Sequence, residues 1–155
     1  MNAGRTLSLS ATIAIFLTVS MGGYTTQTGS GLACPDWPLC HGKLFPQPMT
    51  AALLIEWTHR LLAALSGLLL VSTVLYLLLR RRKERGLVAK GLLALLLLMV
   101  QIWLGGLVVL QELVPVLVTL HLSVAVATFG MMVVLTTSIW DVGMRAQARD
   151  AKQAP

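Results

Sequence analysis

Four long apolar stretches, separated by polar segments, dominate the pattern of hydrophobic and polar positions along the chain. A helix needs about 20 mostly apolar residues to cross the hydrocarbon core of a bilayer. The stretches that meet this length are residues 6–23, 51–79, 87–110 and 114–140. The pattern predicts an all-α integral membrane protein: one domain of residues 1–145 folded as a four-helix transmembrane bundle, an outer loop of residues 24–50, and a short tail of residues 146–155.

The first stretch is the least certain span, because it carries several hydroxyl side chains: Ser8, Ser10, Thr12, Thr18 and Ser20. With Arg5 in front of it, it also fits a cleaved signal peptide. No clear small-x-small cleavage site closes it, so we expect it to be a membrane span.

Composition supports the membrane assignment. Hydrophobic residues make up 56% of the chain and charged residues 12%, whereas soluble domains average about 25% charged residues. The mean hydropathy is +0.79. The formal charge of +6 is compatible with nucleic-acid binding, but the positive charges flank the apolar stretches, where membrane orientation explains them. We therefore expect a lipid bilayer around the protein and no nucleic acid as a partner.

The basic residues gather on one side of the predicted membrane. A run of them, Arg80–Arg85, separates the second and third stretches, and others flank the first and fourth stretches: Arg5, Arg145, Arg149 and Lys152. The loop of residues 24–50 holds only Lys43. The positive-inside rule then places both termini in the cytoplasm and this loop outside, in a multi-pass protein of the plasma membrane.

The outer loop holds both cysteines of the chain. Disulfides persist in an oxidising compartment, so a Cys34–Cys40 bridge is expected. A ring this short gains little from loop closure, so the bridge is either a local clip or a redox-active pair. A zinc site made of both cysteines and His41 is the alternative, but structural zinc takes four ligands and the loop offers three.

Ionisable side chains inside two of the stretches mark the candidate site, because such groups are costly in a membrane. Glu56, His59 and Arg60 lie in the second stretch, and His121 lies in the fourth. Glu56 and His59 are three residues apart and share one helix face. At the helical rise per residue, His59 lies roughly 12 Å and His121 roughly 10 Å below the outer ends of their stretches. The two histidines are therefore expected at similar depth.

Two histidines at one depth on two helices predict a haem site. Imidazole is a normal axial ligand of haem iron, and helix bundles build such sites from facing helices. Small residues that leave room for a flat ring follow both histidines: Ser66, Gly67, Ser123, Ala125, Ala127 and Gly130. Small residues also serve ordinary helix packing, and a buried histidine can simply hydrogen-bond a neighbour, so these alternatives stay open.

Three segments resemble the haem A synthase family: GGYTTQTGSGLACPDWP at residues 22–38, EWTHR at 56–60 and TLHLSVA at 119–125. They occur in the family's order and cover most of the chain. Members of this family oxidise the C8 methyl of haem O to a formyl group, giving haem A for terminal oxidases. The resemblance implies the same activity here, with haem O as substrate and haem B as a possible second haem.

The resemblance also implies roles for individual residues. His59 and His121 match the axial ligands of haem iron, and Glu56 matches the family's catalytic glutamate. Arg60 stands beside the ligand and suits a haem propionate. The cysteines of the outer loop match a pair that forms a disulfide and takes part in the haem or electron path.

The chain departs from the family in size. Typical members have eight spans in two similar halves, and this chain resembles one half, so we expect one haem site per chain and self-association into a homo-oligomer. Haem O synthase is a further expected partner. A weak internal echo, Gly22–Gly23 and Gly105–Gly106, suggests repeated hairpins.

Two other functions fit part of the pattern. A b-type cytochrome that only carries electrons needs the histidines but leaves Glu56 and the cysteine pair unexplained. A small transporter that uses Glu56 as its proton site does not need two histidines at one depth.

Overall fold

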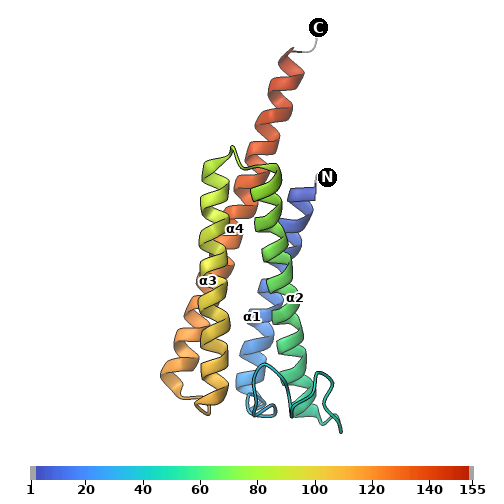
Figure 1. Ribbon diagram of the computed structural model, residues 1–155, viewed down its shortest axis with the longest axis vertical. Coiled ribbons are helices and arrows are strands. Elements are labelled where there is room, and N and C mark those ends of the chain that lie inside the picture. The colour runs from blue at the N-terminus through green and yellow to red at the C-terminus, as the bar shows by residue number, and fades with distance from the viewer. Residues whose placement is uncertain (1–2, 154–155) are drawn as a thin grey trace.

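Four helices make up most of the computed structural model, which describes residues 3–153 (Figure 1). They are α1 (Ala3–Gln27), α2 (Ala51–Arg80), α3 (Arg85–Leu110) and α4 (Pro115–Gln153). Each is long and apolar enough to cross a membrane. The structure therefore confirms the all-α membrane fold that the apolar stretches predicted.

Two helices extend beyond their predicted spans. α1 continues through the polar residues 24–27, where the hydroxyls of Thr25 and Thr26 bond to carbonyls one turn earlier. α4 continues through the predicted tail, because residues 144–153 contain neither Gly nor Pro and are rich in good helix formers. Hydropathy predicts where a chain enters the membrane, and these two ends are helical without being apolar.

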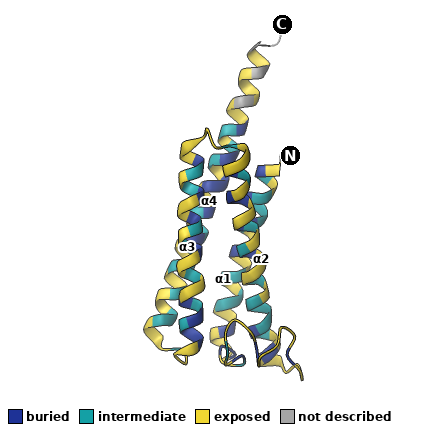
Figure 2. Ribbon diagram, viewed as in Figure 1, coloured by how far each residue is buried: buried dark blue, intermediate teal, exposed yellow. Residues whose placement is uncertain are grey.

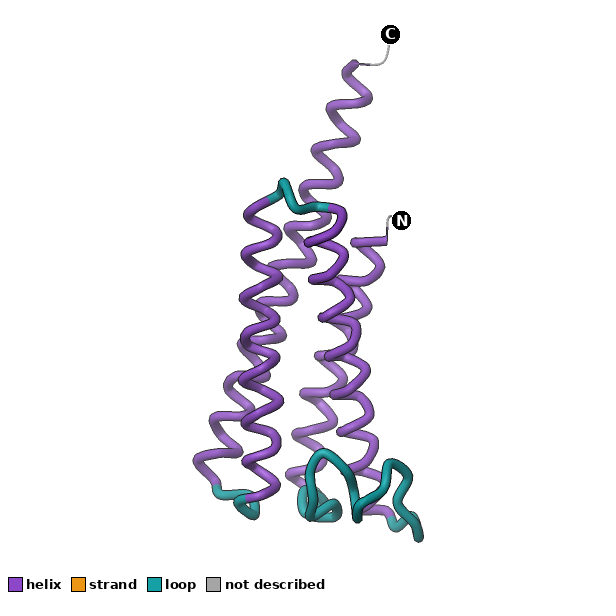
Figure 3. The backbone as a smooth tube through the Cα atoms, viewed as in Figure 1, coloured by secondary structure: helices purple, strands orange, loops and turns teal. Residues whose placement is uncertain are grey.

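The bundle consists of two hairpins, α1–α2 and α3–α4, placed side by side. α1 also packs against α4, and α2 against α3, so the four helices form a closed ring. Both marked termini and the connection between α2 and α3 lie at one end, here called the termini end (Figure 1). The 28–50 loop and the 111–114 turn lie at the opposite loop end (Figure 3).

The apolar core lies toward the termini end. Its buried residues are Ala11, Ile15, Leu70, Val74, Leu77, Leu87, Ala94, Leu98, Met132, Leu135 and Ile139. Toward the loop end, by contrast, α4 has no buried residue over residues 115–127, all of which the structure describes (Figure 2). We call the part with this core the packed half, and the part with Glu56, His59 and His121 the histidine half.

Hydroxyl groups join α1 to its neighbours in the packed half. The Thr12 and Thr136 hydroxyls are 2.9 Å apart, and the Thr136 hydroxyl also donates to the Ser8 carbonyl at 3.1 Å. The Thr18 hydroxyl reaches that of Ser66 at 3.4 Å. Polar side chains in a bilayer need such partners. The hydroxyls that made the first stretch look least apolar thus bind this helix into the bundle.

Candidate functional site

The two span histidines lie at similar levels on helices that both begin at the loop end. His59 is the ninth residue of α2 and His121 the seventh of α4, which corresponds to roughly 12 Å and 9 Å of helix. Both residues are partly buried. The structure thus places the two residues that the sequence pattern paired at similar levels, on two helices that belong to different hairpins.

Each imidazole ring lies against a glycine of its own hairpin. A Cβ added at Gly22 of α1 would stand 2.9 Å from Cε1 of His59. A Cβ added at Gly105 of α3 would stand 3.1 Å from Cε1 of His121. The rings therefore occupy space that exists only because these helix positions lack a side chain. The glycine echo in the sequence was the only signal of this arrangement.

Each ring also has a buried nitrogen that is available to bind a ligand. Nδ1 of His59 and Nδ1 of His121 are buried and make no hydrogen bond of good geometry within residues 3–153, although each ring lies close to a backbone hydrogen-bonding group, that of Thr18 for His59 and that of Gln101 for His121. On the second ring, Nε2 lies 3.1 Å from Nε2 of Gln101, whose Oε1 is also buried without a partner. An unpaired polar atom in a membrane interior is costly. Imidazole nitrogens are standard axial donors to haem iron, so this pair fits haem.

Glu56 lies one turn nearer the loop end than His59 and is buried, with 4% of its surface exposed. Its Oε1 accepts a hydrogen bond from Nε of Arg60 at 2.7 Å. The ion pair keeps this carboxylate from standing alone in the bundle. Glu56 and His59 therefore share a face, as their spacing predicted.

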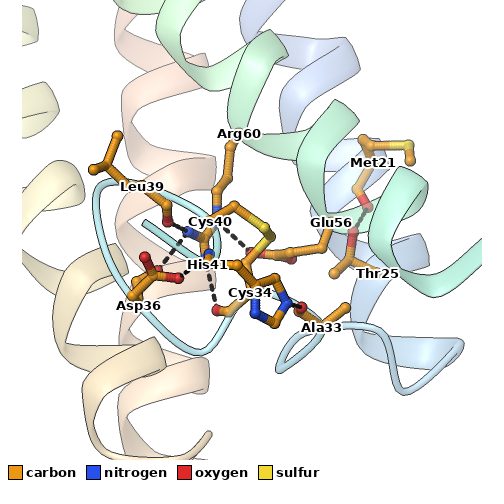
Figure 4. A network of polar contacts seen from close by, with 10 residues as sticks. All are labelled: Met21, Thr25, Ala33, Cys34, Asp36, Leu39, Cys40, His41, Glu56 and Arg60. Atoms are coloured by element: carbon orange, nitrogen blue, oxygen red, sulfur yellow. Dashed lines mark hydrogen bonds and ion pairs between the residues drawn. A yellow bond between two sulfur atoms is a disulfide. The ribbon is translucent and has the colours of Figure 1, made fainter. Parts of the chain in front are cut away.

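Arg60 does more than pair with Glu56. Its Nη1 donates to the carbonyls of Asp36 at 2.7 Å and Leu39 at 2.6 Å, and its Nη2 donates to the carbonyl of Cys34 at 2.8 Å (Figure 4). Four hydrogen bonds thus hold the guanidinium between α2 and the outer loop. Sequence reasoning missed this contact, because backbone carbonyls leave no trace in residue type. The expected contact of Arg60 with a haem propionate stays a prediction.

The outer loop is closed by a Cys34–Cys40 disulfide with a Cα–Cα distance of 4.7 Å. The expected bridge is therefore present, and the zinc alternative is wrong because both thiols are used. His41, the third ligand of that alternative, has its Nε2 2.9 Å from the Ala33 carbonyl. The bridge belongs to a small buried cluster that also includes Leu53 of α2.

A tight turn follows the second cysteine. Cys40 and Lys43 exchange two backbone hydrogen bonds of 3.0 Å, and His41 and Gly42 between them have φ angles of 53° and 69°. Positive φ at both central positions is typical of a two-residue hairpin turn. The Asp36 carboxylate accepts the N–H groups of Gly42 at 2.7 Å and His41 at 2.6 Å. These bonds, that from Gly42 above all, lower the pKa of Asp36 below its usual value.

The loop also touches both hairpins. The Trp57 indole of α2 donates to the Leu44 carbonyl at 2.8 Å. The Trp37 ring lies over Gly106 of α3, where an added Cβ would stand 3.3 Å from Cδ2. The loop therefore bridges the two hairpins at the end where residues 115–127 of α4 include no buried residue.

Comparison with known proteins agrees with this geometry. The model of the COX15-CtaA family, described as cytochrome oxidase assembly protein, matches residues 5–52 and 47–155. The chain belongs to this family, the haem A synthase family that its motifs resemble.

Several curated relatives bear the name heme A synthase. That of Staphylococcus carnosus is 35% identical over 148 residues, covering 92% of this chain and 46% of the relative. That of Exiguobacterium sp. is 28% identical over 131 residues, covering 84% and 44%. That of Bacillus licheniformis is 27% identical over 143 residues, covering 92% and 47%. The chain thus spans about half the length of the curated relatives that it matches.

Proposed function

We propose that this chain binds haem between its two hairpins and oxidises the C8 methyl of haem O to the formyl of haem A. One observation carries the proposal: two histidines on different helices lie at one level, each with a buried Nδ1 that makes no hydrogen bond of good geometry in the described residues, and one of them, His59, shares its helix face with the buried Glu56. Membership of a family with relatives named heme A synthase supports the same activity. The b-type cytochrome stays the alternative if no oxidation occurs.

His59 and His121 are the residues that would hold the haem iron, and the iron when bound supplies the redox chemistry. The net reaction converts a methyl group and one water into a formyl group, four protons and four electrons, and the electrons must pass on to an electron acceptor outside this chain. Several protons must therefore leave an apolar site. A buried carboxylate near the reacting carbon can accept them, and Glu56 is the only acidic side chain that the described part of the four helices buries.

Arg60 has a positioning role in this proposal. Its bond to Oε1 fixes the Glu56 carboxylate, and its bonds to three loop carbonyls fix the loop above the same carboxylate. A proton acceptor that is held in place needs less reorganisation when charge moves onto it, so less free energy is spent on that reorganisation. The disulfide-closed loop limits entry of water from the loop end.

The decisive experiment is chromatography of haem extracted from cells that supply haem O. We expect the wild type to produce haem A. Glu56→Gln keeps the side-chain shape but not the acid, so it should insert, bind haem with a near-normal spectrum, and accumulate haem O or its hydroxymethyl form. Glu112→Gln, at an exposed position in the loop-end turn, is the matched control and should produce haem A normally.

The outcomes separate the candidates. Wild-type levels of haem A from Glu56→Gln would remove this residue from the chemistry. Haem bound by the wild type with no haem A formed would leave the electron carrier as the function.

Ligation is tested separately by absorption spectroscopy. His59→Ala and His121→Ala should each weaken or shift a low-spin haem spectrum, because each removes one imidazole. His41→Ala, in the outer loop, should leave the spectrum unchanged. Unaltered spectra in both span variants would contradict the ligand assignment.

Three further proposals concern the surroundings. The basic α2–α3 connection and both termini face the cytoplasm of a plasma-membrane protein, and the disulfide loop faces outside. Single cysteines placed at Lys83 and Lys43 in a protein without Cys34 and Cys40 test this, since only Lys43→Cys should react with an impermeant reagent. The second and third proposals are that the chain self-associates and that it contacts haem O synthase. Cross-linking in membranes tests both.

A further inference from the structure

The two hairpins present their histidines in the same way. In each hairpin the second helix carries the histidine, and the first helix carries a glycine under the imidazole ring: Gly22 under His59 and Gly105 under His121. The two contacts lie in different hairpins, and their glycines are 83 residues apart, yet they join the same ring atom, Cε1, to the same kind of helix position. This repetition indicates a common requirement rather than two packing accidents.

The sequence around the two glycines repeats as well. Residues 18–23 read TVSMGG and residues 101–106 read QIWLGG, so each pair of glycines follows a polar residue by one helical turn. Residues four apart lie on the same helix face. In α3 the polar residue, Gln101, is the one whose amide lies 3.1 Å from Nε2 of His121. In α3, the polar residue and the first glycine therefore form one surface that faces the histidine, whereas in α1 the Thr18 hydroxyl bonds to the Ala14 carbonyl and to the Ser66 hydroxyl.

Only the first glycine of each pair contacts a histidine. A Cβ at Gly23 would meet nothing within 4 Å, and one at Gly106 would meet Trp37 instead. Glycine is less favourable than alanine inside a helix, so helix stability does not explain the glycine beneath each ring. The contact with the ring is the feature that does.

We infer that Gly22 and Gly105 are positioning residues that set the orientation of the two haem-ligating imidazoles, and that Gln101 fixes the rotation of the His121 ring. Without a Cβ on the neighbouring helix, each ring can approach that helix closely through Cε1. This contact fixes the plane of the ring and so the directions in which its two nitrogens point. The inference rests on the proposed haem ligation, because only a ligand needs the ring plane to be fixed.

A methyl group at either position should move the ring, not the helices. The nearest atom belongs to the end of a side chain that can rotate, and the distances of 2.9 Å and 3.1 Å are shorter than ordinary carbon contacts of about 3.5 Å. Gly22→Ala and Gly105→Ala should therefore fold as well as the wild type. Their electron paramagnetic resonance should show shifted low-spin g-values, and their haem content should fall several-fold, more for Gly22→Ala.

Gly23→Ala is the matched control, because it makes the same change one residue away with nothing within 4 Å. It should keep the wild-type g-values and haem content. Gln101→Leu, which is similar in size but has no amide, should shift the g-values as well, through His121 alone.

A second measurement tests the coupling between glycine and ring. In His59→Gly protein given free imidazole, the ligand is no longer tethered to α2 and can adjust its position. Gly22→Ala should then have little further effect, whereas Gly105→Ala should keep its full effect. The inference would be overturned if Gly22→Ala lowered haem content and shifted the g-values in the His59→Gly protein as much as it does in the wild type, just as Gly105→Ala is expected to do.

The remaining outcomes are equally clear. If His59→Ala abolishes the low-spin signal while Gly22→Ala matches Gly23→Ala, the inference fails and haem ligation stands. If neither histidine variant changes the spectrum, haem ligation itself fails. Loss of folded protein in Gly22→Ala but not in Gly23→Ala assigns the glycine to helix packing and also overturns the inference.

Discussion

The packed half and the histidine half are built from the same four helices but differ in what fills them. In the packed half, aliphatic side chains from all four helices interlock, and hydroxyls of α1 bond to α4. In the histidine half, the described buried groups include a carboxylate and unpaired imidazole nitrogens, and the first turns of α4 bury no residue. One end of the bundle therefore supplies stability, and the other holds the groups that we propose to carry out the chemistry.

The two halves are also fastened differently. The helices of the packed half hold each other directly, through van der Waals contacts that dominate helix association in lipid. In the histidine half, the outer loop holds the hairpins together: Arg60 ties it to α2, and Trp37 lies on α3. Changes in the first half should therefore lower global stability, and changes in the second should act locally.

The largest effect is expected from the packed half. Leu135 is fully buried in the core, and Leu135→Ala should lower the free energy of unfolding by about 3 kcal/mol, because it leaves a cavity among interlocked side chains. Leu122, on the same helix in the histidine half, is 49% exposed. Leu122→Ala should cost less than about 0.5 kcal/mol. Unfolding in mixed micelles measures both, and equal losses would contradict the division.

Arg60→Met should have the next largest effect. It should lower the local stability of the loop end by about 2 kcal/mol, because it leaves the buried Glu56 carboxylate without its partner. The damage should concentrate in the loop, where three carbonyls lose their donor. Limited proteolysis within residues 28–50 should accelerate, while core amides keep their protection from hydrogen exchange. Arg82→Met, exposed near the termini end, is the control, and identical proteolysis of the two variants would disprove the tether.

Loss of the disulfide should affect stability less. The ring that Cys34 and Cys40 close is short, and the entropy argument gives it less than about 2.5 kcal/mol. Cys34→Ser with Cys40→Ser should leave a folded bundle. Its yield of haem A should fall strongly, while its unfolding midpoint should change little. Mass spectrometry after alkylation, with and without reductant, verifies the bridge in the wild type; two free thiols in oxidised protein would contradict it.

The smallest effect concerns pH and the loop turn. Hydrogen bonds from Gly42 and His41 lower the pKa of Asp36 below its usual value. A lowered folded-state pKa means that the stabilisation is present above about pH 4 and is lost as the pH falls through the folded pKa. Because Asp36 is only partly buried, the effect should be confined to the turn. The protection of the His41 and Gly42 amides from hydrogen exchange, measured relative to the intrinsic rate at each pH, should fall on acidification. Asp36→Asn should remove that response.

Much of the fold could be predicted, because a bilayer imposes strong constraints on sequence. Apolar length located all four helices, and the spacing of Glu56 and His59 placed both on one face. The depth of His121 was predictable because a helix has a fixed rise per residue. These inferences needed only periodicity and length, which the sequence states directly.

The rest depended on contacts that residue types do not encode. Arg60 could be read as a ligand for a propionate, but its loop carbonyls belong to the backbone and can come from any residue. The ring contact of Gly22 required knowing which helix lies opposite His59, which hydropathy does not reveal. The ends of α1 and α4 were missed because polar residues can extend a helix beyond the membrane.

The hydroxyl contacts between α1 and α4 have a consequence for biogenesis. Thr136 bonds to Ser8 and Thr12, more than a hundred residues earlier in the chain. Translation delivers the helices in order, so the first helix acquires its second neighbour only after the last helix has entered the bilayer. Until then, one flank of the α1–α2 hairpin faces lipid. Closing the ring of four helices therefore has to wait for the insertion of α4, and until then the Ser8 carbonyl and the Thr12 hydroxyl lack their partner on that helix.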